Sequence, residues 1–376
     1  MKWRGVLGLM GFSRGPFSGL LFGDWLRLLY RYRFRVPRSY RIPVVLITAG
    51  SIFNSIVHTL EVLRFCAKIR KAEYRPPLFV LGVPRSGTTH LFNLFSKDER
   101  YAYPNLIQAY NPHTFLCAEQ FLARLFDACR FRNRGLDNVA TGSKVPEEDE
   151  HALLALTQLS HLLCGPFPRL AYRYNRYLTF RSASQDEVVT WKAAIKFFVR
   201  KMSFKYGGRP LVLKSPAHTG RIRMILDVFP DAKFVFIHRN PFDVFQSYRQ
   251  ILVTFSYYFD LSSSDGGDAA TDVTLEFFRE LFEAFFEDRE LIPKANYCEL
   301  SYASLVEDPI GQMRRIYQAL VLPEFQVVEP ALQSYLASIA DYKKRDSQKL
   351  PADLQARIAR EWSRWFEEWG YPTSQI

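Results

Sequence analysis

A short apolar run that ends in a glycine-rich turn constrains the fold of this chain more than any other feature. The run Leu78 to Val83 (LFVLGV) follows Pro76 and Pro77, which end the preceding helical pattern. Its length and composition are those of a strand buried on both faces. The segment Thr88 to Ser96 (TTHLFNLFS) continues as a helix. A buried strand that turns directly into a helix is typical of a parallel α/β sheet.

The same alternation of strand and helix recurs along the chain. Further strands are predicted at 211–213, 233–237 and 297–300, and helices at 147–163, 220–229, 241–252 and 274–289. We therefore expect an α/β fold of three layers, with a central parallel sheet and a P-loop-like phosphate-binding turn. The polar stretch 261–270 (LSSSDGGDAA) predicts an exposed loop.

Residues 1–75 form an N-terminal helical extension in this interpretation, and residues 76–376 form the main domain. Apolar residues recur at helical spacing over 20–29, with Arg27 and Arg31 opposite, and a second helix is predicted from about Ser51 to Lys71. The apolar run 42–53 is about half of the ~20 residues that span a bilayer. We therefore expect the chain not to cross a membrane. The N-terminus lacks the features of a signal peptide.

The net charge of +12 is concentrated near the N-terminus. Residues 1–41 contain nine basic side chains and one acidic side chain, Asp24. A basic segment rich in Trp and Leu indicates peripheral contact with an anionic membrane, and no zinc-finger or RNA-binding signature points to nucleic acid. The five cysteines are widely spaced and form no CxxC pair. We therefore expect no metal site and a reducing, cytoplasmic location, with contact at the inner face of the membrane.

The glycine-rich turn runs from Gly82 to Thr89 (GVPRSGTT). A helix N-terminus stabilises an anion through its unpaired N–H groups and the positive end of its dipole. The G-x4-G spacing matches a Walker loop, but Thr88 stands where a nucleotide triphosphatase has lysine. The turn therefore predicts a site for a phosphate-like group that is handled without a metal.

A second anion site is predicted after the strand 233–237. Arg239 follows the strand end, where open α/β sheets bind ligands, and Ser247 comes eight residues later on the following helix. An arginine fork together with a helix-borne hydroxyl suits a phosphate monoester.

The two motifs together resemble the sulfotransferases that use 3′-phosphoadenosine 5′-phosphosulfate (PAPS), specifically the broad bacterial branch of that family. The family's P-[KR]-[ST]-G-T-T turn matches residues 84–89, and its arginine and serine eight residues apart match Arg239 and Ser247. The resemblance implies that the 5′-phosphosulfate lies on the turn, the 3′-phosphate on Arg239 and Ser247, and the adenine near Tyr302. The turn residues implied in donor binding are Arg85, Ser86, Gly87, Thr88 and Thr89.

Three residues are candidates for the chemistry itself. Lys214 ends a predicted strand, and the resemblance implies that it stabilises charge on the departing phosphate. The acceptor hydroxyl also needs a base with a pKa near neutrality. His218 has a suitable intrinsic pKa, and Glu148 lies in an acidic run, 147–150, where mutual repulsion raises carboxyl pKa values. Both alternatives stay open, with His218 slightly ahead.

The expected function is transfer of a sulfuryl group from PAPS to a hydroxyl on a small molecule, with a lipid, sterol or glycolipid favoured by the basic N-terminus and the 15% aromatic content. Two alternatives remain. One is a kinase or nucleotide triphosphatase of related fold, which would require ATP and magnesium. The other is a non-catalytic protein that binds at the membrane surface.

Overall fold

In the computed structural model, four parallel strands form one sheet in the order β2-β1-β3-β4. The strands are β1 (Leu78–Leu81), β2 (Val212–Lys214), β3 (Lys233–His238) and β4 (Tyr297–Ser301). Leu78 lies opposite Val212 on one side and Lys233 on the other. The chain therefore passes from one side of β1 to the other between β2 and β3. This change of direction puts the ligand-binding crevice of an open α/β sheet at the carboxyl end of β1.

The structure describes residues 17–31, 33–34, 41–128, 142–164, 171–258, 268–340 and 349–375. The chain divides into two compact units. Unit 1 comprises residues 1–75, 103–167 and 184–209, and unit 2 comprises residues 76–102, 168–183 and 210–376. The sheet belongs wholly to unit 2.

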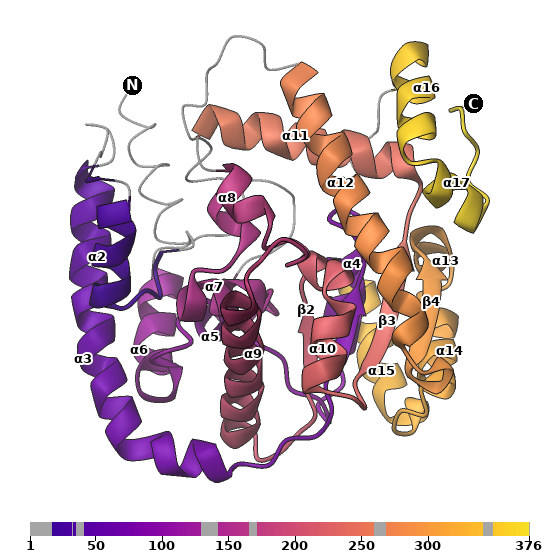
Figure 1. The fold of residues 1–376 in the computed structure, drawn as a ribbon. Coiled ribbons are helices and arrows are strands. Elements are labelled where there is room, and N and C mark those ends of the chain that lie inside the picture. The colour runs from indigo at the N-terminus through magenta and orange to yellow at the C-terminus, as the bar shows by residue number, and fades with distance from the viewer. Residues whose placement is uncertain are drawn as a thin grey trace. The chain divides into compact units, whose positions relative to one another are not determined.

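Helices surround the sheet within unit 2, and Figure 1 shows α10 and α12 lying across the viewer's side of the strands. Helix α4 packs against β1 and β2, while α14 packs against β4. The helical segments of unit 2 are α4 (Thr88–Phe95), α8 (Ala171–Asn175), η4 (Pro216–Gly220), α10 (Ile222–Val228), α11 (Pro241–Tyr258), α12 (Asp268–Asp288), η5 (Arg289–Leu291), η6 (Lys294–Asn296), α13 (Tyr302–Glu307), α14 (Pro309–Ala319), α15 (Phe325–Ser338), α16 (Ala352–Glu361) and α17 (Ser363–Trp369).

The core of unit 2 is aromatic around β1. The Phe79 ring is fully buried and stacks on Phe234 of β3, with the ring centres 5.6 Å apart. Every residue of β1 is buried, as the unbroken apolar run requires. Each such side chain contributes about 1.5–3 kcal/mol through burial, and the strand end beside it is thereby held rigidly.

The regular elements of unit 1 are all helices, over its described residues. Its segments are α2 (Phe22–Arg31), α3 (Arg41–Lys71), α5 (Leu106–Tyr110), α6 (Phe115–Ala128), α7 (Glu150–Thr157), η2 (His161–Cys164) and α9 (Gln185–Lys205). The long helix α3 packs against α2, α6 and α9.

The predicted fold class is confirmed, and each predicted strand lies within about one residue of its place, apart from β1, which ends at Leu81. The helix boundaries were predicted less well. Helix α3 begins at Arg41 instead of about Ser51, and Pro43 lies in its first turn, where proline is tolerated. The helix expected over 147–163 is interrupted at Gln158, whose φ of 59° is left-handed.

Some expectations fall on residues outside the described ranges. The loop expected at 261–270 lies outside the described residues up to residue 267. From Asp268 the chain is in α12, so the loop prediction was wrong for residues 268–270. Five basic residues of the N-terminal segment, Lys2, Arg4, Arg14, Arg35 and Arg38, also lie outside the described residues. The division into domains 1–75 and 76–376 stays a prediction.

Candidate anion-binding site

The turn after β1 adopts backbone angles that few residues tolerate. Gly82 has a φ of +145°, and a Cβ atom there would lie 2.6 Å from the carbonyl oxygen of Ile237. Gly87 has a φ of +105°, and its added Cβ would lie 2.3 Å from the Tyr302 ring. Arg85 is also left-handed, at +72°, which costs a non-glycine residue about 1–2 kcal/mol. Strain of this kind is concentrated at functional sites.

Helix α4 begins directly after this turn. Gly87 occupies the N-cap position and has no side chain with which to cap the helix. The first-turn N–H groups, beginning at the buried Thr88 and the half-buried Thr89, therefore suit an anion. Ser86 is buried, and its hydroxyl donates to the Val83 carbonyl at 2.8 Å. In this structure that hydroxyl stabilises the turn.

The two predicted anion motifs meet, although about 150 residues separate them in sequence. Arg85 Nε donates to Ser247 Oγ at 2.8 Å, and Arg239 Nη1 donates to the Arg85 carbonyl oxygen at 3.1 Å. Two guanidinium groups, one hydroxyl and the start of α4 thus lie at one edge of the sheet. Such a group of donors can bind more than one oxyanion.

Residues of α11 and α13 also hold the Arg239 side chain in place. Its Nε and Nη2 donate to Asp243 Oδ2 at 3.1 and 2.8 Å, across one turn at the start of α11. The guanidinium also lies over the Tyr302 ring, 4.8 Å from its centre. Tyr302 follows β4 directly and contacts the position of Gly87 as well. Tyr302 therefore forms a wall shared by both motifs, a contact that its place in the sequence alone did not reveal.

Lys214 is the last residue of β2 and pairs in register with Val80 of β1. Its side chain is almost fully buried, and its ammonium lies 5.8 Å from the centre of the Phe92 ring of α4. The structure therefore brings Lys214 to the same carboxyl edge of the sheet as the turn and Arg239.

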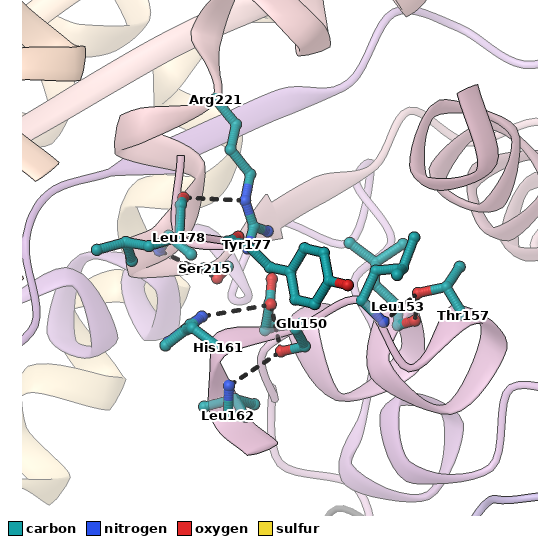
Figure 2. A network of polar contacts seen from close by, with 12 residues as sticks. Glu150, Leu153, Thr157, His161, Leu162, Tyr177, Leu178, Ser215 and Arg221 are labelled. Carbon is teal, nitrogen blue, oxygen red and sulfur yellow. Dashed lines mark hydrogen bonds and ion pairs between the residues drawn. The ribbon is translucent and has the colours of Figure 1, made fainter. Parts of the chain in front are cut away.

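The 3₁₀ helix η4 secures the turn from the side of β2. Gly82 N donates to Thr219 Oγ1 at 2.9 Å in a fully buried hydrogen bond. Arg221, at the end of η4, is buried and donates to the carbonyl oxygens of Leu178 and Tyr177 (Figure 2). Sequence reasoning missed Thr219 and Arg221, because no local pattern reveals a contact over 137 residues.

The two candidate bases have different surroundings. His218 lies in η4 with no exposed surface, and its ring packs edge-on against Phe79, 5.4 Å between centres. This position in the sheet core favours a packing role. Glu148 belongs to unit 1, directly before α7, and is partly exposed. Neither role is decided by these positions, and both residues stay predictions.

The acidic run before α7 is mostly buried. Glu150 accepts a hydrogen bond from Ser160 Oγ at 2.6 Å, and its carboxylate lies 3.5 Å from His161 Nδ1 (Figure 2). Glu147 accepts from the backbone N–H of Glu148 at 3.1 Å. These contacts give Glu147 and Glu150 structural partners. Among the described residues, no cluster of three or more His, Cys, Asp or Glu side chains could hold a metal ion.

A histidine next to Arg239, His238, has an unusual environment. His238 Nδ1 lies 2.8 Å from the Tyr371 hydroxyl, and its ring stacks on Trp369 with centres 4.7 Å apart. Burial lowers the pKa of His238 to about 4. The imidazole is therefore neutral near pH 7, so the charge beside Arg239 does not change there.

Residues 76–326 match the model of a family described as the sulfotransferase family. Two curated proteins named omega-hydroxy-beta-dihydromenaquinone-9 sulfotransferase Stf3, from Mycobacterium bovis and Mycobacterium tuberculosis, are 32% identical over 354 residues. These alignments cover 94% of this chain and 90% of each relative.

Two solved structures are similar in fold. Sulfotransferase STF9 from Mycobacterium avium has a TM-score of 0.67 at 19% identity, covering 87% of this chain and 85% of that one. Sulfotransferase STF1 from Mycobacterium tuberculosis has a TM-score of 0.63 at 16% identity, covering 96% and 91%.

Proposed function

This chain belongs to the sulfotransferase family, and from that premise we propose that it transfers a sulfuryl group from PAPS to the hydroxyl of a lipid-like acceptor. One observation carries the choice of donor. Arg239 Nη1 lies 3.1 Å from the carbonyl oxygen of Arg85, so two oxyanion-binding motifs share one edge of the sheet. A nucleotide with a phosphate on each side of its ribose suits such an arrangement.

The residues at this edge fit the donor. The turn Arg85, Ser86, Gly87, Thr88 and Thr89 would hold the 5′ end, with Gly87 leaving room for phosphate oxygens close to the backbone. Arg239 and Ser247 would hold the 3′-phosphate, and the Tyr302 ring would lie near the adenine. The contact between Arg85 Nε and Ser247 supports a further role, in which Arg85 reaches from the turn toward the 3′ side.

Lys214 supplies the charge that the reaction needs. When bound, PAPS provides a sulfuryl group whose S–O bond to the 5′-phosphate breaks as a bond to the acceptor oxygen forms. The Lys214 ammonium would stabilise the negative charge that develops on the phosphate side. A base removes the acceptor proton, and we propose Glu148 ahead of His218 for this role, because the His218 ring is buried against Phe79. We expect charge stabilisation by Lys214 and the arginines of the site to suffice without a metal.

The acceptor is proposed from the relatives. The two Stf3 proteins are named for a hydroxylated dihydromenaquinone, and they align over almost the whole of this chain. We propose an acceptor of the same chemical class, an apolar molecule with one accessible hydroxyl. The enzyme would then work in the cytoplasm at the inner face of the membrane, where such an acceptor resides.

The reaction is tested by sulfuryl transfer from PAPS to a panel of long-chain, sterol and sugar alcohols. We expect Arg85→Ala and Lys214→Ala to lower turnover by about a hundredfold or more, since each removes a charge that stabilises the transition state. The matched controls Arg360→Ala and Lys294→Ala change exposed residues outside the two motifs, and these variants should keep full activity. Unchanged turnover in both test variants would remove the mechanism, and a requirement for ATP and magnesium would favour a kinase.

The base is tested separately, with two conservative substitutions. The variant that lacks the base should lose turnover while it still binds 3′-phosphoadenosine 5′-phosphate (PAP) normally. We expect this pattern for Glu148→Gln. For His218→Asn we expect lower stability instead, because its ring fills a position in the core.

A further inference from the structure

Helix α3 of unit 1 buries several polar side chains and exposes many apolar ones. Ser51, Asn54 and Glu61 are buried, whereas Val45 and Leu63 are 66% and 80% exposed. A helix on the surface of a water-soluble domain shows the opposite pattern. Of the six buried residues of α3, three are polar and the other three are Pro43, Ile47 and Ile69, so a single misplaced side chain does not explain the exposed apolar face.

The buried polar groups have partners within unit 1. The Asn54 amide donates to the carbonyls of Ser18 and Leu20 at 2.8 and 3.2 Å. Glu61 accepts from the backbone N–H of Leu116 at 2.8 Å and forms an ion pair with the buried Lys201. These contacts fix which side of α3 faces the unit. The outward direction of the apolar side is therefore determined by the fold.

The exposed apolar side chains form one continuous stripe. At 3.6 residues per turn their positions fall within about 120° of one face, and at about 1.5 Å per residue the stripe is about 30 Å long. Its members are Ile42, Val45, Leu46, Ile52, Phe53, Ile56, Leu60 and Leu63. Helix α6 extends the surface, because exposed Phe121 lies 5.8 Å from Phe53 between ring centres and exposed Leu125 is one turn further on. These ten residues are called the α3 surface below.

Basic side chains lie at both ends of the α3 surface. Arg41 precedes the stripe, and Arg64, Lys68, Arg70 and Lys71 follow it, all of them exposed. Glu61 is the one acidic residue within α3, and it is buried against Lys201. A cavity of about 250 Å³ lies between α3 and α9 toward the C-terminal end of α3. Apolar and basic side chains line it as well, among them Val62, Ile69, Phe197, Arg70, Lys196 and Arg200.

We propose that the α3 surface docks unit 1 onto an anionic lipid bilayer, with α3 lying in the plane of the interface. The apolar stripe would enter the boundary of the acyl chains, while the basic ends contact anionic headgroups. By length and composition α3 could also cross a membrane. The in-plane arrangement is favoured because the polar side of α3 packs against α9, whose Lys192, Lys196 and Lys201 would otherwise enter the hydrocarbon.

Vesicle co-sedimentation of the purified full-length chain tests this surface. We expect pelleting with mixed phosphatidylcholine and phosphatidylglycerol vesicles and much weaker pelleting with phosphatidylcholine alone. The double variant Val45→Glu/Leu63→Glu should lower the partition coefficient at least about tenfold, since it puts a carboxylate near each end of the stripe. The control Val306→Glu/Val327→Glu alters exposed valines of unit 2 and should bind vesicles like the wild type.

Each other outcome contradicts the proposal. Equal pelleting of the wild type and the Val45/Leu63 variant, or no pelleting of either, would show that lipid does not cover the α3 surface. Resistance of the bound chain to alkaline carbonate would indicate a spanning helix. In another outcome, the wild type would form a dimer in sedimentation equilibrium without lipid and bind no vesicles. If the Val45/Leu63 variant alone were then a monomer, the surface would be assigned to a second copy of the chain. The inference rests on unit 1 alone, so PAP binding to the Val45/Leu63 variant should remain normal. A PAP-binding measurement therefore tests the proposed reaction independently of the membrane surface.

Discussion

At the scale of single residues, the site depends on side chains held in unfavourable or unusual states. Arg85 keeps a left-handed backbone that most residues avoid, and its guanidinium is thereby directed to Ser247. The P-[KR]-[ST]-G-T-T pattern marked this turn as an anion site. It could not indicate that Arg85 reaches toward the second motif, because that direction follows from a backbone angle and not from residue type.

His238 gives a prediction about pH. Burial lowers its pKa from an ordinary 6.5 to about 4 in the folded chain. The unfolded chain therefore takes up a proton first as pH falls, so stability is fully present above about pH 6.5 and decreases between pH 6.5 and 4. We expect His238→Asn to reduce this loss by about 3 kcal/mol, measured by urea unfolding at several pH values. An identical pH profile for the variant would contradict the burial of a neutral imidazole.

At the scale of elements, the strands were easier to predict than the helix ends. Apolar runs such as LFVLGV and KFVFI lie within a sheet buried on both faces, and that environment admits few other residues. The start of α3 at Arg41 was missed because its exposed face is as apolar as a core, which removes the alternation that marks a surface helix. The break at Gln158 depends on a left-handed residue that carries no sequence signal.

Contacts between elements also escaped prediction, and the link from η4 to the turn is the clearest of them. Gly82 N donates to Thr219 Oγ1 in a buried hydrogen bond. Thr219→Val keeps the shape but leaves that N–H without its acceptor, which we expect to cost about 1–3 kcal/mol of unfolding free energy. Thr219→Ser keeps the hydroxyl and should cost clearly less. Urea unfolding of both variants decides the matter, and a larger loss in Thr219→Ser than in Thr219→Val would mean that packing of the methyl group dominates.

At the scale of the whole molecule, the sequence predicted the two motifs of the candidate anion site but not how closely they meet. Sheet order puts Arg239 beside the turn, because β3 is a direct neighbour of β1. The contacts of Arg239 with Asp243 and Tyr302 then fix its guanidinium. A proton-accepting residue and an acceptor site could not be derived in the same way, since neither has a motif with fixed spacing.

Isothermal titration with PAP and with adenosine 5′-monophosphate tests the central claim most directly, because the two ligands differ only in the 3′-phosphate. The wild type should bind PAP at least about tenfold more tightly, since charge-assisted hydrogen bonds contribute about 1.5–3 kcal/mol. Arg239→Ala should bring the two affinities close together by weakening PAP alone. Equal affinities in the wild type, or an unchanged ratio in Arg239→Ala, would contradict the assignment of this edge to one doubly phosphorylated nucleotide.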